Sequence, residues 1–426
     1  MKPYSQMTKA ELETEQEHVL SLLTDARELH LKLDMSRGKP CKEQLDLSME
    51  MLTDLASAKD CLAGETDVRN YGVLGGLPEA RAYFAELLGT TPDCVFVGGN
   101  ASLQLMYDLI SKAVTHGLKN SPTPWKNRKT LRFLCPAPGY DRHFRITESF
   151  GFDMIPIAMT EHGPDMDYVE QWVKDPDVVG MWCCPKFSNP DGIVYDDETV
   201  RRIAALQTAA PDFALIWDNA YVIHEFDTEY REFPDILSLA DAAGNRDMVY
   251  EFASTSKITF PGAGISCMAS SPENIAYLTK LIGVQTIGFD KINQLRHVRF
   301  LQSKQHTLEL MQKHAAILKP HFDVVLDALE TEIAPLEIAR WTKPKGGYFI
   351  SLYAMPGTAK KTLSLCKEAG VTMTPAGATY PKGQDPFDSN IRIAPSVPSV
   401  EELREASRIL CLCLRLTALD QLLKLT

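Results

Sequence analysis

The stretch VYEFASTSKITFPGAGISCMA, residues 249–269, holds two short apolar runs on either side of a loop that contains one lysine, Lys257. The runs, VYEFA (249–253) and ISCMA (265–269), lack regular polar alternation, which is typical of strands buried on both faces. Five further runs of this kind precede them: CVFVG (94–98), LRFLC (131–135), MIPIAM (154–159), VVGMWCC (178–184) and FALIW (213–217). Because they alternate with helical patterns, we expect an α/β fold with a mostly parallel seven-stranded sheet wrapped by helices.

The 426 residues are too many for one ordinary domain. Residues 8–33 have helical spacing, with a possible capping box formed by Thr8 and Glu11, and residues 293–330 predict one long helix. The C-terminal part predicts a strand pair around 346–352, a helix near 358–369, a strand over 390–394 and a helix from residue 400. We therefore expect three parts: an N-terminal helix and arm over 1–45 that packs with the small domain, a large domain over 46–310, and a smaller α/β domain over 311–426.

Composition excludes several classes of protein. The net charge of −12, without a cluster of Lys and Arg, argues against a nucleic-acid surface. No signal-peptide core and no apolar run of membrane-spanning length is present, so we expect a cytoplasmic protein. The ten cysteines lack the spacing of a zinc site, and we expect no metal and mostly buried, reduced thiols.

Two chemistries fit the lysine segment. Ser254 and Lys257 have the Ser-x-x-Lys spacing of serine acyl enzymes, which requires both residues on a helix. Pro261 and two nearby glycines disfavour that helix. The other chemistry is a Schiff base between the lysine amine and an aldehyde, which requires only a strand end and a loop.

The residues that follow the predicted strands favour the second chemistry, because ligands of an open parallel sheet gather at the carboxyl ends of its strands. Five strand ends supply an anion-binding turn before a helix, a ring, an amide, a carboxylate with a phenol, and an amine: Asn100-Ala101-Ser102, Tyr140, Asn189, Asp218 with Tyr221, and Ser254 to Lys257. Pyridoxal phosphate requires these groups for its phosphate, ring, 3′-oxygen, pyridinium nitrogen and aldehyde. The sequence therefore predicts a site for this cofactor.

Several motifs carry a family resemblance over nearly the whole chain: RGKP (37–40), YGVLGGLPEAR (71–81), NPDG (189–192), WDNAY (217–221), STSK (254–257) and NIRIAPS (390–396). Together they resemble the fold-type-I pyridoxal-phosphate aminotransferases, and in particular a divergent bacterial branch of aspartate aminotransferases. The resemblance implies transfer of the amino group from L-aspartate to 2-oxoglutarate. It also implies a homodimer with shared active sites.

The resemblance assigns roles by position. The catalytic residues would be Lys257, which binds the cofactor covalently, Asp218, which pairs with the pyridinium nitrogen, and Tyr221. Further residues would contact the 3′-oxygen, the ring or the phosphate of the cofactor. They are Asn189, Tyr140, Asn100, Ala101, Ser102, Ser254, Ser256, and Tyr71 from a neighbouring subunit. Substrate contacts would come from Gly38, Asn189 and Arg392, which pairs with the α-carboxylate.

One position departs from the family pattern. The family usually has a phosphate-binding arginine eight residues after the lysine, and this chain has Ile265 there. The phosphate is therefore expected to rest on Ser102, Ser254, Tyr71 and the helix N-terminus after Asn100, or on a lysine or arginine from elsewhere in the chain. The cation for a second substrate carboxylate also stays open among four candidates: Arg37, Lys39, Lys291 and Arg296.

Three alternatives to this function remain. The first is another pyridoxal-phosphate enzyme on the same scaffold, either an aminotransferase for aromatic or aliphatic donors or a lyase or decarboxylase. The second is the serine acyl enzyme. The third is a binding or regulatory protein that retains the scaffold, which we would expect to carry an added partner domain.

Overall fold

The computed structural model describes residues 2–227 and 229–425. Its central feature is an eight-stranded sheet in the order β4-β11-β10-β9-β8-β5-β6-β7. All seven predicted strands are present: β4 (Val95–Val97), β5 (Arg132–Ala137), β6 (Asp153–Thr160), β8 (Val178–Cys183), β9 (Ala214–Asp218), β10 (Val249–Ser254) and β11 (Ser266–Ala269). The eighth, β7 (Gly163–Pro164), is a two-residue edge strand that the sequence did not predict.

The sheet is mostly parallel, as expected. The pairs β6–β5, β5–β8, β8–β9 and β9–β10 are parallel, whereas β11 runs antiparallel to both β10 and β4. Consequently β4 runs in the same direction as β10. The carboxyl ends of the five strands that precede the candidate site residues therefore lie along one edge of the sheet.

Successive strand residues enter different hydrophobic clusters, as burial on both faces requires. In β5, Phe133 packs in one cluster and Leu134 in another, and in β8 Met181 and Trp182 divide in the same way. Helices supply the rest of each cluster. On one face they are α4 (Ser102–Thr115), α5 (Asp141–Ser149) and α9 (Pro272–Gln285), and on the other α6 (Met166–Trp172), α7 (Asp197–Ala204) and α8 (Ile236–Ala242).

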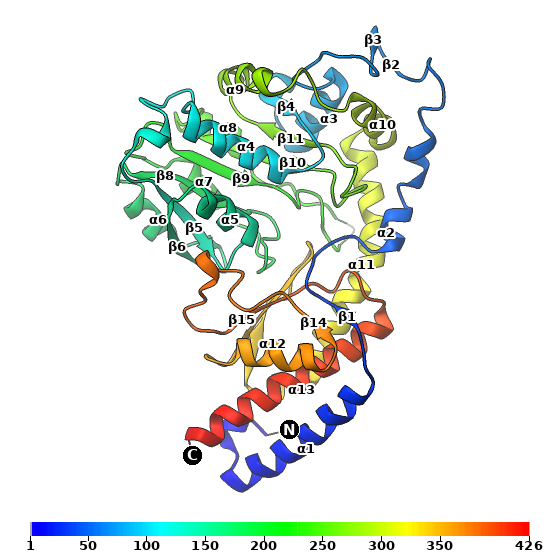
Figure 1. Ribbon diagram of the computed structural model, residues 1–426, viewed down its shortest axis with the longest axis vertical. Coiled ribbons are helices and arrows are strands. Elements are labelled where there is room, and N and C mark those ends of the chain that lie inside the picture. The colour runs from blue at the N-terminus through cyan, green and yellow to red at the C-terminus, as the bar shows by residue number, and fades with distance from the viewer. Residues whose placement is uncertain (1, 228, 426) are drawn as a thin grey trace.

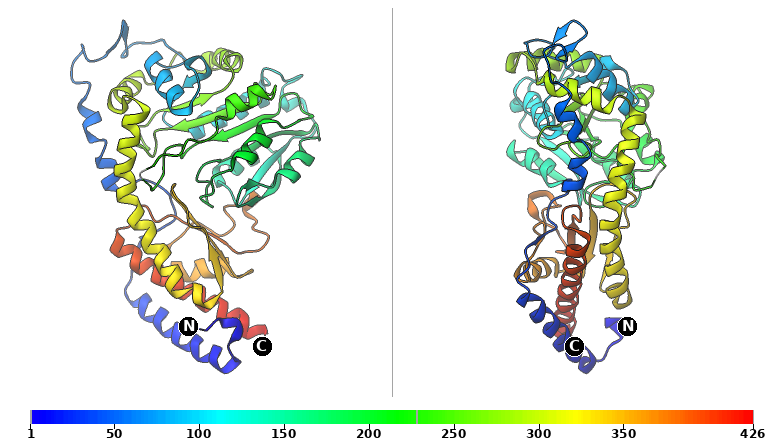
Figure 2. Two further views of the ribbon diagram at one scale, coloured as in Figure 1. Left: turned by 180° about the vertical axis from the view of Figure 1, so that it is seen from behind. Right: turned by 90° about the vertical axis from the view of Figure 1, so that its right-hand side faces the viewer.

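The predicted long helix over 293–330 is wrong, because the structure has two helices there. These are α10 (Lys291–Leu301) and α11 (Lys304–Glu332). Gln302 adopts φ 57°, outside the helical region, and Ser303 caps α11 by accepting a hydrogen bond from the backbone N–H of His306. Figures 1 and 2 show α11 running from the large sheet to the lower part of the molecule.

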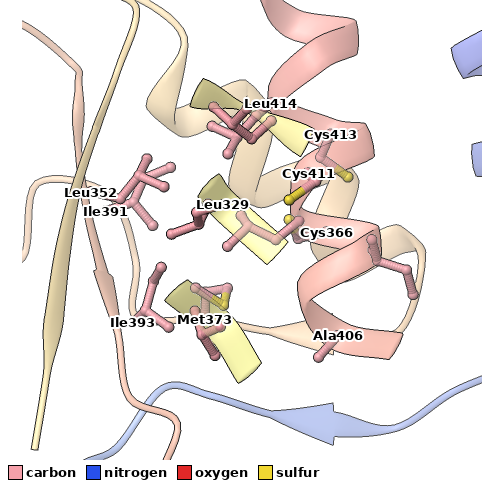
Figure 3. Close-up of a cluster of buried hydrophobic side chains, with 14 of the residues drawn as sticks. Leu329, Leu352, Cys366, Met373, Ile391, Ile393, Ala406, Cys411, Cys413 and Leu414 are labelled. Atoms are coloured by element: carbon pink, nitrogen blue, oxygen red, sulfur yellow. The ribbon is translucent and has the colours of Figure 1, made fainter. Parts of the chain in front are cut away.

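That lower part contains a second, three-stranded antiparallel sheet of β12 (Ala339–Trp341), β13 (Ile350–Ala354) and β15 (Asn390–Ile393). Helices α12 (Ala359–Glu368) and α13 (Val400–Leu425) pack with it. Figure 3 shows part of its buried interior, here called the C-terminal cluster, with aliphatic and sulfur-containing side chains: Leu329, Leu352, Cys366, Met373, Ile391, Ile393, Ala406, Cys411, Cys413 and Leu414. The expected domain boundaries near residues 45 and 310 stay a prediction.

The N-terminal helix α1 (Lys9–Glu28) begins with the predicted capping box of Thr8 and Glu11. It packs along α13 through buried leucines and an ion pair of 2.6 Å between Glu15 and Arg415. The helix ends earlier than residue 33, because Leu33–Asp34 forms a strand, β1, that pairs with β14 (Val371–Thr372). Figure 1 shows both chain ends at this lower end of the molecule.

Among the residues described, no helix is both long and apolar enough to cross a membrane. All ten cysteines are free thiols, and all but Cys94 and Cys184 are buried, in agreement with the expectation.

Candidate active site

The strand ends surround a cavity of about 1280 Å³ between the large sheet and the lower part of the molecule. Its lining includes eleven of the thirteen candidate residues: Gly38, Ala101, Ser102, Tyr140, Asn189, Asp218, Tyr221, Ser254, Ser256, Lys257 and Arg392. These come from segments more than 350 residues apart in the chain. Parallel strand direction brings most of them together, and β15 adds Arg392 from the opposite wall.

Asp218 is the last residue of β9, and only one oxygen of its buried carboxylate has a hydrogen-bond partner among the described residues. His143 Nε2 lies 2.8 Å from Asp218 Oδ2, and the His143 ring stacks on Trp182 with ring centroids 4.4 Å apart. Asp218 Oδ1 is buried and has no hydrogen-bond partner among the described residues. A buried carboxylate oxygen without a partner is costly, so this atom is suited to accept a hydrogen bond from a ligand.

Lys257 lies in a turn just after β10, beside two aromatic rings. Its Nζ is 5.1 Å from the ring centroid of Tyr221 and 5.6 Å from that of Tyr348. Burial lowers the pKa of the Lys257 ammonium from 10.5, although the nearby Asp218 carboxylate opposes the shift. A lysine with a lowered pKa is more often a neutral amine, which is the nucleophilic form.

The same segment argues against the serine acyl enzyme. Ser254 is the last residue of β10, and the residues after it form a bend and a turn. In this described segment Ser254 and Lys257 therefore do not lie on one face of a common helix, as the serine acyl chemistry requires. Ser254 instead donates a hydrogen bond to Ser256 Oγ at 3.1 Å.

The N-terminus of α4 forms an anion-binding end of the cavity. Its N-cap is Ala101, whose methyl side chain cannot accept hydrogen bonds from the first N–H groups of the helix. Ser102, Ser254 and Ser256 line the cavity and supply hydroxyls. Ile265, at the position where the family usually has arginine, is buried in a hydrophobic cluster and so contributes no charge.

Arg392 is held on the opposite wall by three polar side chains. Its Nη1 donates to Asp141 Oδ1 at 3.0 Å and to Asn189 Oδ1 at 3.1 Å. Its Nε and Nη2 both lie 3.3 Å from Thr374 Oγ1. The guanidinium also lies 4.9 Å from the Phe349 ring centroid, so the side chain is fixed in direction.

Gly38 is required where it lies because neighbouring rings approach its backbone closely. A Cβ at this position would come within 2.5 Å of Phe349 Cζ and 3.0 Å of Tyr348 Cβ. Any larger residue would displace Phe349, which contacts Arg392. Arg37 and Lys39, on either side of Gly38, both line the cavity.

Two candidate residues do not line the cavity. The side-chain Nδ2 of Asn100 donates to the backbone carbonyl of Pro261 at 3.4 Å, whereas the backbone carbonyl of Asn100 accepts a hydrogen bond from Ser256 Oγ. Tyr71 is 82% exposed on the surface of the chain. The cofactor-binding roles of both residues stay predictions, and that of Tyr71 requires a second subunit.

Only some of the residues predicted to bind the distal carboxylate line the cavity, and four further cationic lining residues were not predicted from the sequence. Arg37 and Lys39 line the cavity, whereas Lys291 and Arg296 do not. The missed lining residues are Arg142 and Arg145 on α5 and Lys360 and Lys367 on α12. Arg142 could have been found from the sequence, because it follows the predicted site residue Tyr140 by two positions, in the first turn of the next helix. No comparable signal marked α12.

Comparisons with known proteins agree with this geometry. A putative aminotransferase of Mycolicibacterium smegmatis is 49% identical over 396 residues, 92% of each chain. An aspartate aminotransferase of Corynebacterium glutamicum is 46% identical over 391 residues, 92% of this chain and 90% of that protein. The crystal structure of an aspartate transaminase from C. glutamicum matches with a TM-score of 0.94 at 45% identity, covering 97% of both chains.

The fold, the cavity and these relatives define the class of protein, which is a pyridoxal-phosphate-dependent aminotransferase of fold type I. The chain belongs to the aspartate aminotransferase family, whose model, described as aspartate amino-transferase, matches residues 5–425. A regulatory protein that merely retains the scaffold is therefore not supported.

The residues present fit the cofactor that the family uses. The unpartnered Asp218 Oδ1 suits the protonated ring nitrogen, and the uncapped α4 N-terminus with its serines suits the phosphate. Burial raises the pKa of the Tyr221 phenol well above its ordinary value, so that it remains a hydrogen-bond donor for the 3′-oxygen. The cavity thus offers a matching group at each end of the ring.

Proposed function

We propose that the enzyme transfers the amino group of L-aspartate to 2-oxoglutarate, giving oxaloacetate and L-glutamate. The observation that carries this proposal is the charge of the cavity. Its lining contains eight Lys and Arg side chains and, among the described residues, two carboxylates, in a chain of net charge −12. Such a concentration of positive charge favours ligands with more than one carboxylate. The 46% identical relative named aspartate aminotransferase supports the same choice.

Two substrate carboxylates require two cations, because an unpaired carboxylate in a closed site is strongly destabilised. We assign the α-carboxylate to Arg392, whose fixed guanidinium suits a bidentate contact. For the distal carboxylate we assign Arg142. It lies next to Asp141, which contacts Arg392, so the two cations approach the same carboxylate from facing walls of the cavity.

In this proposal the chain's own residues bind, orient and move a proton. Pyridoxal phosphate, when bound, supplies an aldehyde for the amine and a ring that accepts electrons. Asp218 accepts the hydrogen bond of the ring nitrogen and keeps it protonated. Asn189 and Tyr221 hold the 3′-oxygen, and Tyr140 covers the ring. Lys257 Nζ, whose pKa is lowered by burial, takes the proton from the Cα atom of the amino acid that Arg392 orients.

The phosphate is bound without the usual arginine in this proposal. Ser102, Ser254, Ser256 and the first N–H groups of α4 would carry it, with Tyr71 from a second subunit. Ile265 supports the idea, because its side chain is committed to the hydrophobic interior. A structure of the holoenzyme with an arginine within hydrogen-bonding distance of the phosphate would refute it.

We also propose a homodimer, located in the cytoplasm, in which each subunit completes the other's site. Tyr71 is exposed, and so are Val284 (91%) and Ile287 (63%). Val284 lies in the last turn of α9, and Ile287 lies in the loop that follows it. This loop neighbours the one that holds Tyr71, since a Cβ at Gly288 would lie 2.8 Å from the carbonyl of Gly72. An exposed apolar patch of this kind favours a second copy as its cover.

Mixed dimers test the shared site. Tyr71→Phe and Lys257→Ala chains, each clearly impaired alone, should regain activity when mixed, because some sites then receive both intact residues. No recovery after verified subunit exchange would contradict the shared site.

Donor specificity tests the substrate assignment. We expect Arg142→Ala to raise KM for aspartate by about 10- to 100-fold, whereas KM for alanine should change by less than about threefold. Lys367→Ala is the matched control, because it removes a cavity cation to which the proposal gives no substrate contact. If the native enzyme prefers aromatic or aliphatic donors over aspartate, the substrate proposal is wrong and only the aminotransferase class remains.

A further inference from the structure

Asp141 is an acidic residue in a cavity whose charged lining residues are chiefly cations. It is the first residue of α5, directly after Tyr140, and its side chain is 19% exposed. Its Oδ1 accepts a hydrogen bond of 3.0 Å from Nη1 of Arg392, which is itself 8% exposed. The residue to which we assign the substrate α-carboxylate is therefore already paired with a carboxylate of the protein.

The hydrogen bonds of Arg392 leave little room for a second carboxylate. A guanidinium has five N–H donors, and a bidentate carboxylate uses two of them that point in the same direction. Nη1 donates to Asp141 and Asn189, and Nε and Nη2 both lie within reach of Thr374. A substrate carboxylate must therefore displace at least one of these partners.

Asp141 is the partner whose displacement relieves repulsion. Asn189 and Thr374 are neutral, whereas Asp141 would place a second negative charge on the same guanidinium. Two carboxylates that share one cation repel each other at this range. Exchange of the Asp141 carboxylate for the substrate carboxylate keeps the charge around Arg392 unchanged.

The displaced carboxylate would retain favourable surroundings. Nε of Arg142 lies 3.9 Å from Asp141 Oδ2. Asp141 is also in the first turn of α5, where the helix dipole stabilises negative charge. A small rotation of the side chain would suffice, since it already faces the cavity.

We propose that Asp141 is an internal stand-in for the substrate α-carboxylate, which neutralises Arg392 in the ligand-free protein and is displaced when substrate binds. The inference rests on the proposed role of Arg392 in the preceding section. It makes Asp141 a specificity-determining residue, because an anion that takes the place of Asp141 on Arg392 must first break the internal pair. A ligand with further contacts, such as the amine and the distal carboxylate of aspartate, overcomes this competition more easily than a simple monoanion does.

The test uses the holoenzyme and propionate, a monocarboxylate that lacks an amine and does not react. Asp141→Asn keeps an oxygen that can accept from Arg392 but removes the charge, and Asp141→Ser does the same with a smaller side chain. We expect both variants to bind propionate about tenfold more tightly than the wild type, measured by titration of the cofactor's visible absorbance. KM for aspartate should fall by several-fold, so that kcat/KM rises.

Asp153→Asn is the control for net charge, because Asp153 is exposed at the start of β6. It should leave the propionate dissociation constant unchanged. A propionate dissociation constant that is unchanged or raised in both Asp141 variants would overturn the inference. Failure of the wild-type holoenzyme to transaminate any amino acid would instead refute the proposed function, since the propionate titration does not depend on turnover.

Discussion

The active-site cavity and the C-terminal cluster are built from opposite kinds of side chain. The cavity is lined by cations, serines and a carboxylate oxygen without a partner. The C-terminal cluster consists of buried aliphatic and sulfur-containing side chains from β13, β15, α11, α12 and α13, together with Met373. Figure 3 shows these side chains gathered in one place. In the cluster, shape and volume determine stability. In the cavity, charge and hydrogen-bonding capacity are reserved for ligands, so substitutions there should change chemistry more than stability.

The largest effect that separates the two regions is expected from Lys257→Ala. Loss of the amine removes both the nucleophile and the proton acceptor, so turnover should fall by roughly 10⁴-fold or more. The free energy of unfolding of the apoenzyme should not decrease, because the substitution removes a buried amine with a lowered pKa. Steady-state kinetics and urea unfolding check the two expectations. A stable variant that retains more than a tenth of the activity would break the contrast.

The opposite behaviour is expected from Leu329→Ala in the C-terminal cluster. Leu329 is buried on α11, and its truncation should lower the free energy of unfolding by roughly 2–5 kcal/mol. The kcat at a temperature well below unfolding should stay within about twofold of the wild type. A large loss of kcat without loss of stability would show that the two regions are coupled.

A smaller and pH-dependent effect is expected at Glu251, a buried acid in β10. Burial raises the pKa of this carboxyl group to about 8, and Asn219 donates a hydrogen bond to it at 2.9 Å. Between the ordinary value of 4.5 and about 8, the folded protein holds a proton that the unfolded chain has released. The contribution of Glu251 to stability should therefore be greatest below pH 4.5 and decrease as the pH rises through this window.

Glu251→Gln should remove that dependence. The variant should be more stable than the wild type by on the order of 4 kcal/mol at pH 8, with the difference vanishing below about pH 4.5. Urea unfolding at several pH values measures it. Equal stability of the two proteins at pH 8 would show that Glu251 is ionised in the folded state at no cost.

The smallest effect is expected from salt. Because the cavity is cationic in a negatively charged protein, kcat/KM for aspartate should fall by a few-fold between about 0.05 and 0.5 M salt. For alanine, which carries no net charge, the decrease should be smaller. A similar decrease for both donors would indicate that the cavity charge does not select dicarboxylates.

Much of the cavity could be predicted because the features that form it can be recognised in short stretches of the sequence. Unbroken apolar runs identified the seven strands, and parallel direction then placed Asp218, Tyr221 and Lys257 at one edge. The capping box at Thr8 and Glu11 was equally local. Each of these features depends on neighbouring residues and a known period.

The remaining features depend on which side chains face each other across the fold. Ser303 breaks a continuous helical pattern through one capping bond, and β7 forms only where β6 is available for pairing. Asp141 and Arg142 follow a predicted strand end, yet the sequence does not show which side chains of a helix face the cavity. The contact of Asp141 with Arg392, 251 residues later, required the structure.

The most direct test of the account is chemical mapping of the cofactor. The purified protein should be yellow, and borohydride reduction followed by peptide mass analysis should place one pyridoxyl group on Lys257 of each chain. Prior addition of aspartate should convert the cofactor to its amino form and prevent this attachment. A pyridoxyl adduct on another lysine, or no adduct on a protein that binds the cofactor, would contradict the assignment of the active site.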